Sequence, residues 1–388
     1  MKIYFDNSAT TAIREECLAK YCEISREVFG NPSSLHKEGF AAERELNTAR
    51  AEVLSSVADK LSSVIFTASG SEANNLAIIG RALSKERYLR GARIITTDGE
   101  HASVSSPVEK LAKMGFDVVK ISTRGGTIDM HELEEALTPN VILVTVMHVN
   151  NETGAVYDIP AVSRLTHAKC PDALVHVDAT QSYMKIPFTK KSLGADMITV
   201  SSHKIEGPKG VGALIVGPEV IKSRGLSPLI LGGGQEQGLR SGTENVPAVA
   251  AFGEAVRLAK GCVSDTNGKC SALRDKLINM LSDAPFSAIS ITRPPIHAPH
   301  ILNITLPSIR SETMLHFLSA KGIFVSSGSA CSSNSEDVSS ALIAYGRTPE
   351  EADCSIRISF SHRNTEEEVE IFAQALAEGL ERLARRRR

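Results

Sequence analysis

Short hydrophobic runs and helical stretches alternate along residues 60–217. The runs are rich in β-branched residues, which is typical of strands, and amphipathic segments separate the earlier ones. The run at 141–147 shows no polar alternation, as expected of a central strand that is buried on both faces. The alternation predicts a mostly parallel α/β sheet covered by helices. The predicted strands are 63–67, 93–97, 118–122, 141–149, 174–177, 197–200 and 212–216, and the helices between the earlier strands include 72–83, 104–113 and 130–137.

The pattern changes in kind after the glycine-rich stretch at 232–234. Residues 246–259 predict a long helix, and the chain beyond it mixes helices and strands in an α+β arrangement. We therefore predict a large α/β domain over residues 15–255 and a smaller α+β domain made of residues 1–14 and 256–388. The elements expected in the C-terminal part are helices at 271–281, 312–320 and 365–384 and strands at 301–306 and 355–360.

Length and composition agree with two domains. A chain of 388 residues exceeds what one compact core usually holds, and 42% hydrophobic with 23% charged residues is ordinary for a globular protein. A net charge of −2 provides no basic field for nucleic acid, and the arginine run at 385–388 is typical of a solvated helix end. The longest apolar run, 141–149, is far shorter than the ~18 residues of a membrane span, so we expect no membrane association.

Cysteine usage indicates a reducing compartment. The seven cysteines are odd in number, widely scattered and form no CxxC pair. A chain of this length does not need disulfide bonds for stability. We therefore expect free thiols, a cytoplasmic location and no metal site.

A lysine directly follows one predicted strand. Ser201, His203 and Lys204 come after the apolar strand at 196–200, and ligands in open α/β sheets collect at the carboxyl ends of strands. The amine can form a Schiff base with a carbonyl cofactor, and the hydroxyl and imidazole can bind a phosphate. A strand-end lysine is by itself more often a surface residue. The glycine-rich turn at 207–212 favours the functional interpretation.

A carboxylate ends the preceding strand. Asp178 is suited to pair with a protonated pyridine nitrogen, and the alternative is a helix N-cap, where aspartate is also favoured. Asp178 and Lys204 are 26 positions and about one crossover apart. That interval lets both side chains reach one pocket, which favours the functional interpretation.

Three further strand ends carry polar groups. Gly70 and Ser71 open a predicted helix whose N–H groups and dipole can bind phosphate, although such residues also cap ordinary helices. Asn151 follows the most buried strand. His101 follows another strand, and a lone histidine is more often structural than catalytic. Together, five strand ends offer phosphate-binding, acid, amide, imidazole and amine groups, which fits one cofactor.

These segments resemble the cysteine desulfurases of the class V aminotransferase family, which use pyridoxal 5′-phosphate (PLP). The similarity runs nearly end to end, from residues 6–11 and 30–34 to 355–357. The resemblance implies a fold-type I PLP-dependent transferase, with a mostly parallel seven-stranded sheet in the large domain and a smaller α+β domain. The most specific motifs are MHVNNE at 147–152, HVDATQ at 176–181, RSGT at 240–243 and SSGSAC at 326–331.

The resemblance also implies a role for each candidate residue. Lys204 would bind PLP through a Schiff base and move the substrate proton, and His101 would lie over the ring and act in acid–base steps. Asp178 would pair with the pyridinium nitrogen, and Arg357 would grip the substrate carboxylate with its planar fork. The other expected contacts are Gln181 and Asn151 to the phenolic oxygen, Asn151 also to the substrate, and Gly70, Ser71, Ser201 and His203 to the phosphate. Thr243 would complete the phosphate site from a second subunit, which implies a homodimer.

Cys331 lies in a run of small polar residues, 326–335, without an apolar anchor. Buried structural cysteines normally lie among apolar residues, whereas a glycine- and serine-rich loop can carry a thiolate to a substrate. The run resembles the motif of the long-loop group of desulfurases. It predicts that Cys331 is the nucleophile that takes sulfur from L-cysteine as a persulfide, and that the other six cysteines are core or surface residues.

Partners and alternatives remain open at this point. The sulfur acceptor is expected to be an iron–sulfur scaffold protein or a tRNA-thiolation enzyme, and with a scaffold Cys331 is also a candidate iron–sulfur ligand. No direct contact with nucleic acid is expected. The closest alternative is a selenocysteine lyase; a transaminase would have no use for Cys331, and an inactive PLP-fold binding protein would be colourless. Glu206 departs from the family pattern, in which its position is often aromatic or histidine.

Overall fold

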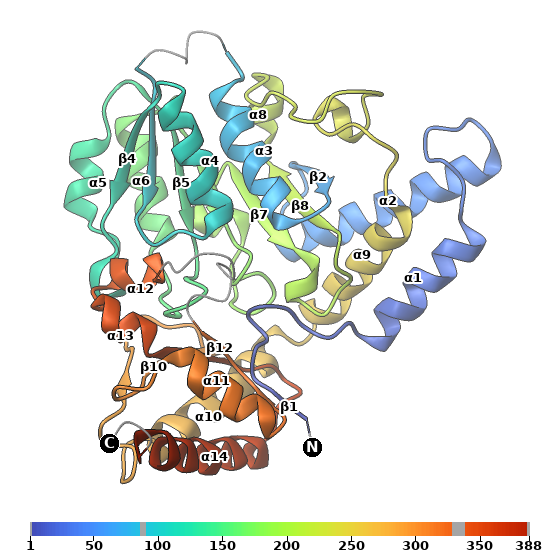
Figure 1. Ribbon diagram of the computed structural model, residues 1–388. Helices are drawn as coiled ribbons and strands as arrows, with labels where there is room; N and C mark the ends of the chain where they lie inside the picture. The colour runs from blue at the N-terminus through green and yellow to red at the C-terminus, as the bar shows by residue number, and fades with distance from the viewer. Residues whose placement is uncertain (1, 86–90, 328–337, 386–388) are drawn as a thin grey trace.

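The computed structural model describes residues 2–85, 91–327 and 338–385. Its larger part, in the upper half of Figure 1, is built on one seven-stranded sheet of order β2-β8-β7-β6-β5-β3-β4. β8 runs antiparallel to both neighbours, and the other adjacent pairs are parallel. The predicted mostly parallel α/β sheet is confirmed. The strands are β2 (Ser63–Thr67), β3 (Arg93–Thr97), β4 (Asp117–Ile121), β5 (Val141–Met147), β6 (Leu174–Asp178), β7 (Met197–Ser201) and β8 (Gly212–Val216).

Side chains of the central strands alternate between two apolar cores. In β8, Ala213 and Ile215 pack in the first core, and Leu214 and Val216 pack in the second. Because both faces of the sheet are covered, these strands are continuous apolar runs in the sequence. Helices α1 (Glu15–Glu27), α2 (Lys37–Ser56), α5 (Met130–Ala136), α6 (Ile159–Lys169) and α9 (Val246–Lys260) contribute to the first core, and α3 (Gly70–Ala82) and α4 (Ala102–Lys113) contribute to the second.

The hydrophobic pattern does not predict α1 or α2. Three of the five residues that α2 buries are glycine or alanine, so its buried face is weakly apolar and gives little helical periodicity. Both helices pack against α9 beside the sheet (Figure 1). The domain boundary expected at residue 255 falls inside α9, which continues to Lys260 and packs with the first core.

The smaller part contains a four-stranded antiparallel sheet of order β12-β13-β10-β9. The N-terminal strand β1 (Ile3–Tyr4) pairs in parallel with β11 (Ile323–Phe324), and Phe5 packs edge-on against Phe360 and Phe372 in the core of this part. The first residues of the chain therefore fold with its C-terminal third. The elements are β9 (Ser290–Ile291), β10 (Ile301–Thr305), β12 (Ser326–Ser327), β13 (Ser355–Ser359), α10 (Val263–Met280), α11 (Ser311–Ala320), α12 (Ser340–Tyr345), α13 (Pro349–Asp353) and α14 (Glu366–Arg385).

Short elements connect the rest of the larger part. They are α7 (Lys190–Leu193), α8 (Pro218–Lys222) and the 3-10 turns η2 (Arg124–Gly126), η3 (Ser202–Lys204) and η4 (Glu236–Gly238). Across the three described ranges, no helix combines the length and the apolar character that a membrane span needs.

Candidate active site

A cavity of about 290 Å³ lies where β6 and β7 end, between the large sheet and the smaller part. Ser327 and Arg357 line it from the smaller part. The topology brings the predicted strand ends together because parallel strands end at the same edge of a sheet. Ten residues predicted from the sequence line this cavity: Gly70, Ser71, His101, Asn151, Asp178, Gln181, Ser201, His203, Lys204 and Arg357.

Two predicted residues are not among those that line the cavity. Thr243 is exposed on the surface of this single chain. Cys331 lies outside the described residues, and Ser327, the last described residue before it, lines the cavity. Within the described chain, no three histidine, cysteine, aspartate or glutamate side chains gather as metal ligands.

An anion-binding corner forms where α3 begins. Ser69 caps this helix by accepting a hydrogen bond from the Glu72 N–H at 3.1 Å, which leaves the first N–H groups, those of Gly70 and Ser71, beside the cavity. The helix start lies tightly against β8, because a Cβ atom on Gly212 would be only 2.7 Å from the Gly70 nitrogen. The corner therefore depends on a glycine at the first position of β8.

Two side chains at the end of β7 line the same cavity. Ser201 ends the strand, and His203 follows it in η3. Burial, with the neighbouring Lys204 as a second cause, lowers the pKa of His203 to about 4, so the ring is neutral at pH 7. Its Nδ1 lies 3.1 Å from Thr10 Oγ1. Helix N–H groups, a hydroxyl and a neutral imidazole form a donor set suited to a phosphate.

Asp178 is buried and held by two hydrogen bonds. Its Oδ1 accepts from the Thr180 N–H at 2.9 Å, and its Oδ2 accepts from Asn74 Nδ2 at 2.8 Å. In the described chain the next helix, α7, begins only at Lys190, so the alternative of a helix N-cap does not hold. The carboxylate therefore lines the cavity and is available there for a cationic partner.

His101 joins Asp178 through a chain of hydrogen bonds. Asn74 Nδ2 also donates to Ser103 Oγ at 2.8 Å, and this hydroxyl lies 2.8 Å from His101 Nδ1. The Ser103 N–H donates to the same Nδ1 at 3.1 Å, so a neutral ring carries its proton on Nε2. Burial lowers the pKa of His101, partly opposed by Asp178. The sequence reasoning missed Asn74 and Ser103, which are single polar residues on helices without any motif.

The N-terminal segment fixes the Lys204 amine. Lys204 Nζ donates to the carbonyl oxygens of Ser8 at 2.6 Å and Ala9 at 2.8 Å. Gln181 Nε2 donates to the same Ser8 carbonyl at 2.9 Å. The amine is thus held at the wall of the cavity by backbone oxygens that lie almost two hundred positions away in the sequence.

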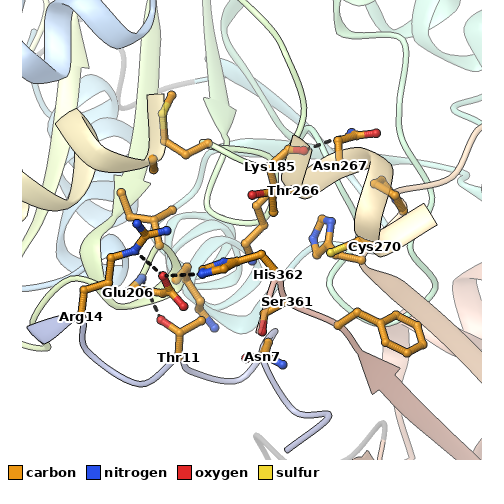
Figure 2. Close-up of a pocket in the computed structure, with 17 residues that line it drawn as sticks. Asn7, Thr11, Arg14, Lys185, Glu206, Thr266, Asn267, Cys270, Ser361 and His362 are labelled. Atoms are coloured by element: carbon orange, nitrogen blue, oxygen red, sulfur yellow. Dashed lines mark hydrogen bonds and ion pairs between the residues drawn. The ribbon is translucent and has the colours of Figure 1, made fainter. Parts of the chain in front are cut away.

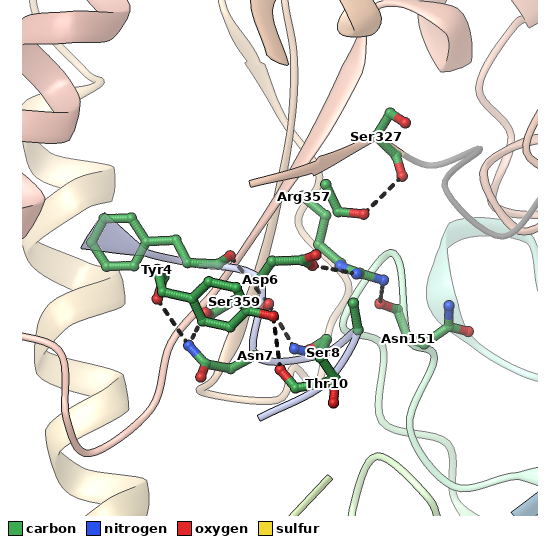
Figure 3. Close-up of polar contacts among 12 residues, drawn as sticks. Tyr4, Asp6, Asn7, Ser8, Thr10, Asn151, Ser327, Arg357 and Ser359 are labelled. Atoms are coloured by element: carbon green, nitrogen blue, oxygen red, sulfur yellow. Dashed lines mark hydrogen bonds and ion pairs between the residues drawn. The ribbon is translucent and has the colours of Figure 1, made fainter. Parts of the chain in front are cut away.

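Arg357 is buried in β13 and oriented by two acceptors (Figure 3). Its two terminal nitrogens donate to the Asn151 carbonyl and to Asp6 Oδ1, both at 2.9 Å. The guanidinium therefore lines the cavity in a fixed orientation, as recognition of a carboxylate requires. The motif at 6–11 contains Asp6, but the sequence reasoning assigned this residue no role.

Comparison with known proteins agrees with this geometry. The family model described as aminotransferase class-V matches residues 3–372. A protein of Archaeoglobus fulgidus named cysteine desulfurase IscS 1 is 37% identical over 98% of this chain and 97% of its own length.

Solved structures show the same likeness. A structure titled NIFS-like protein has a TM-score of 0.90 at 35% identity and covers 98% of this chain and all of its own. A structure titled SspA in complex with cysteine has a TM-score of 0.79 at 31% identity and covers 94% of this chain and all of its own. These matches confirm the fold-type I class expected from the motifs. The chain therefore belongs to the class V aminotransferase family and, within that family, to the cysteine desulfurases.

Proposed function

We propose that this protein uses PLP, bound through Lys204, to convert L-cysteine into L-alanine and that it keeps the sulfur as a persulfide on Cys331. The observation that carries the proposal is one cavity that combines an amine, a buried carboxylate and an anion-binding corner. The substrate is supported by the relative whose structure is titled as a complex with cysteine.

The donor set fits PLP at three points. The start of α3, Ser201 and His203 suit its phosphate, and Asp178, held by Asn74, suits a protonated pyridine nitrogen. Lys204 Nζ suits its aldehyde carbon. When bound, PLP supplies an electron sink that acidifies the α-proton of an amino acid and weakens the bond from its Cβ to sulfur.

The residues of this chain would then act on the substrate directly. Arg357 binds the substrate carboxylate, and Lys204 Nζ takes the proton from Cα. The Cys331 thiolate attacks the substrate sulfur, so an S–S bond forms while the Cβ–S bond breaks. The electron pair of the broken bond stays with the carbon skeleton, which takes up protons and leaves as alanine. His101, with a proton on Nε2, is the nearby acid for such proton transfers.

The environments of the other cysteines support Cys331 as the nucleophile. Burial raises the pKa of Cys17 to about 12 and that of Cys270 to about 11, so both remain thiols at neutral pH. Cys17, Cys22, Cys170, Cys262 and Cys270 carry free thiols, which supports a reducing compartment such as the cytoplasm.

We further propose a homodimer in which Thr243 reaches the phosphate site of the partner subunit. The exposed position of Thr243 is compatible with that role.

The separate apolar core that contains Ile3, Phe5 and residues of 270–380 supports a small domain of residues 1–14 and the chain after α9. The acceptor of the sulfur is proposed to be an iron–sulfur scaffold or a tRNA-thiolation enzyme.

Cys331→Ala tests the proposal. We expect the variant to keep the PLP absorbance and a spectral change on addition of cysteine, because Lys204 and Asp178 are unchanged. Alanine formation and protein persulfide should fall to background, measured by amino-acid analysis and mass spectrometry. Cys262→Ser, at an exposed cysteine, is the control and should behave as wild type. Wild-type desulfuration by the Cys331→Ala protein would refute the proposal, and activity retained on selenocysteine alone would favour the lyase.

A further inference from the structure

Glu206 follows the Lys204 turn and lines a second, smaller cavity. This cavity has a volume of about 50 Å³ and adjoins the first, because Lys204 lines both. Figure 2 shows Glu206 among Thr11, Arg14 and His362. Only 6% of Glu206 is exposed, so its carboxylate needs partners to offset the loss of hydration.

Two arginines and a histidine surround the Glu206 carboxylate. Arg14 Nε donates to Oε2, and Arg363 Nε lies 2.8 Å from Oε1. His362 Nε2 lies 3.8 Å from Oε2. Arg14 comes from the N-terminal segment, whereas His362 and Arg363 follow β13, the strand that carries Arg357. One side chain therefore joins the turn that contains Lys204 to the N-terminal segment and to the residues that follow β13.

The backbone around Glu206 is held by the same N-terminal segment. The Glu206 N–H donates to Thr11 Oγ1 at 2.8 Å, and its carbonyl accepts from the Arg14 N–H at 2.9 Å. Thr11 also donates to the His203 carbonyl, from its N–H at 3.0 Å and its hydroxyl at 2.8 Å. Both sides of Lys204 are thus attached to residues 11–14.

Glu206 adopts an unusual backbone conformation. Its φ of +64° lies in the left-handed region, which is uncommon for residues other than glycine and costs conformational energy that the surroundings must offset. The ion pairs and the two backbone hydrogen bonds are those surroundings. A glycine or asparagine would adopt this φ more easily, so the carboxylate is present for its contacts and not for its conformation.

We propose that Glu206 is a positioning residue for Lys204. Its ion pairs hold η3, the turn that contains Lys204, in a fixed position relative to the end of β13, the strand that carries Arg357. The proposal rests on the function proposed above, because it concerns the same amine. Glu206 does not line the active-site cavity, so it acts through Lys204 and not on the substrate. Its charge contributes by drawing Arg14 and Arg363 onto one side chain.

Glu206→Gln tests the proposal, because it keeps the shape of the side chain and removes its charge. We expect kcat for alanine formation to fall about tenfold or more, since small displacements of a reacting group cost large factors in rate. KM for cysteine should stay within about twofold, because Arg357 keeps its own acceptors, Asp6 and Asn151. A merely structural role would lower the melting temperature without this selective fall in kcat at a nearly unchanged KM.

Amide hydrogen exchange of the apoprotein gives a readout that does not depend on turnover. In Glu206→Gln, residues 202–207 should exchange at least about tenfold faster, because one cause of their protection is removed. Arg363→Gln changes a half-exposed side chain and is expected to fold in any case. It should also lower kcat. In the double variant, the fold-decrease in kcat should be smaller than the product of the two single fold-decreases.

Asp196→Asn is the matched control at the opposite end of β7. Its carboxylate accepts from the Val175 N–H at 2.7 Å and pairs with His167 at 3.0 Å, away from the cavity. This variant should keep kcat within about twofold. Wild-type kcat in Glu206→Gln, or unchanged exchange of the turn, would overturn the positioning role. Absence of alanine formation by the wild-type enzyme would refute the proposed function instead, and the exchange measurement would still decide on Glu206.

Discussion

Burial sets the protonation state of several single residues around the cavity. His101 and His203 are both kept neutral at pH 7 chiefly by the cost of burying a charged ring. Burial likewise raises the pKa of Glu100, the neighbour of His101, to about 8. A neutral imidazole both accepts and donates a proton, so burial prepares His101 for the acid–base role proposed for it.

Glu100→Gln is expected to change how stability depends on pH. Glu100 Oε1 accepts from Thr97 Oγ1 at 2.6 Å and from the Met147 N–H at 2.9 Å. Its folded pKa of about 8 lies above the ordinary 4.5, so its contribution to stability is complete below pH 4.5 and is lost as the pH rises through 8. Glutamine does not titrate. The melting temperature of the variant minus that of the wild-type apoprotein should therefore rise between pH 5 and 9, by about 2 °C or more.

Glu109→Gln serves as the control for this pH series. Glu109 is a largely exposed carboxylate that pairs with Lys120 at 3.2 Å on the surface. Its substitution should shift the melting temperature by nearly the same small amount throughout the range. A Glu100→Gln difference that stays constant from pH 5 to pH 9 would show that Glu100 is already charged in the folded protein.

At the scale of elements, the cavity-lining residues that lie at the end of a strand could be predicted from the sequence. Asp178 and Ser201 end β6 and β7, and the alternation of runs and helices alone predicts that such ends meet. The supporting residues could not be predicted in this way. Asn74 is 104 positions from Asp178, and Asp6 is 351 positions from Arg357, so no local period or spacing connects them. Their roles follow only from the packing of whole elements.

Gly212→Ala tests the packing of the start of α3 against β8. The added Cβ would lie 2.6 Å from the Ser69 carbonyl carbon and 2.7 Å from the Gly70 nitrogen, so backbone must move. We expect a loss of about 1–3 kcal/mol in the free energy of unfolding, as for other overpacked sites. The displaced N–H groups of Gly70 and Ser71 should weaken PLP binding, measured by fluorescence titration of the apoprotein.

Gly268→Ala is the corresponding control within α10. No heavy atom lies within 4 Å of the added Cβ, and alanine is the better helix former. This variant should gain roughly 0.5–1 kcal/mol and bind PLP as the wild type does. Equal stability and equal PLP affinity of Gly212→Ala and the wild type would mean that the anion-binding corner does not depend on this contact.

At the scale of the whole molecule, the N-terminal segment joins the two parts through the active site. It begins as β1 in the smaller part, supplies Asp6 to Arg357, and then supplies the Ser8 and Ala9 carbonyls to Lys204. The sequence predicted that residues 1–14 belong to the small domain. It did not predict that they contact both Arg357 and Lys204, because such contacts depend on how the two parts pack.

The proposed homodimer makes a prediction about exposed apolar side chains. Leu231 is 79% exposed and lies in the same segment as Thr243, which is expected to reach the partner subunit. If that segment is buried in the dimer, Leu231→Lys removes apolar contact area from the interface and buries a charge there. We expect the dissociation constant of the dimer to rise about tenfold or more, measured by analytical ultracentrifugation over a range of concentrations.

Leu61→Lys separates this effect from a general change in surface charge. Leu61 is also 79% exposed, but it precedes β2, at the edge of the sheet opposite the carboxyl ends that form the cavity. Both variants add one positive charge and remove one exposed leucine, so only position distinguishes them. Leu231→Lys should also release PLP more readily when diluted, because dissociation would remove the Thr243 contact. If Leu61→Lys weakens the dimer as strongly, or if diluted Leu231→Lys monomers keep full PLP occupancy, Thr243 does not complete the partner's site.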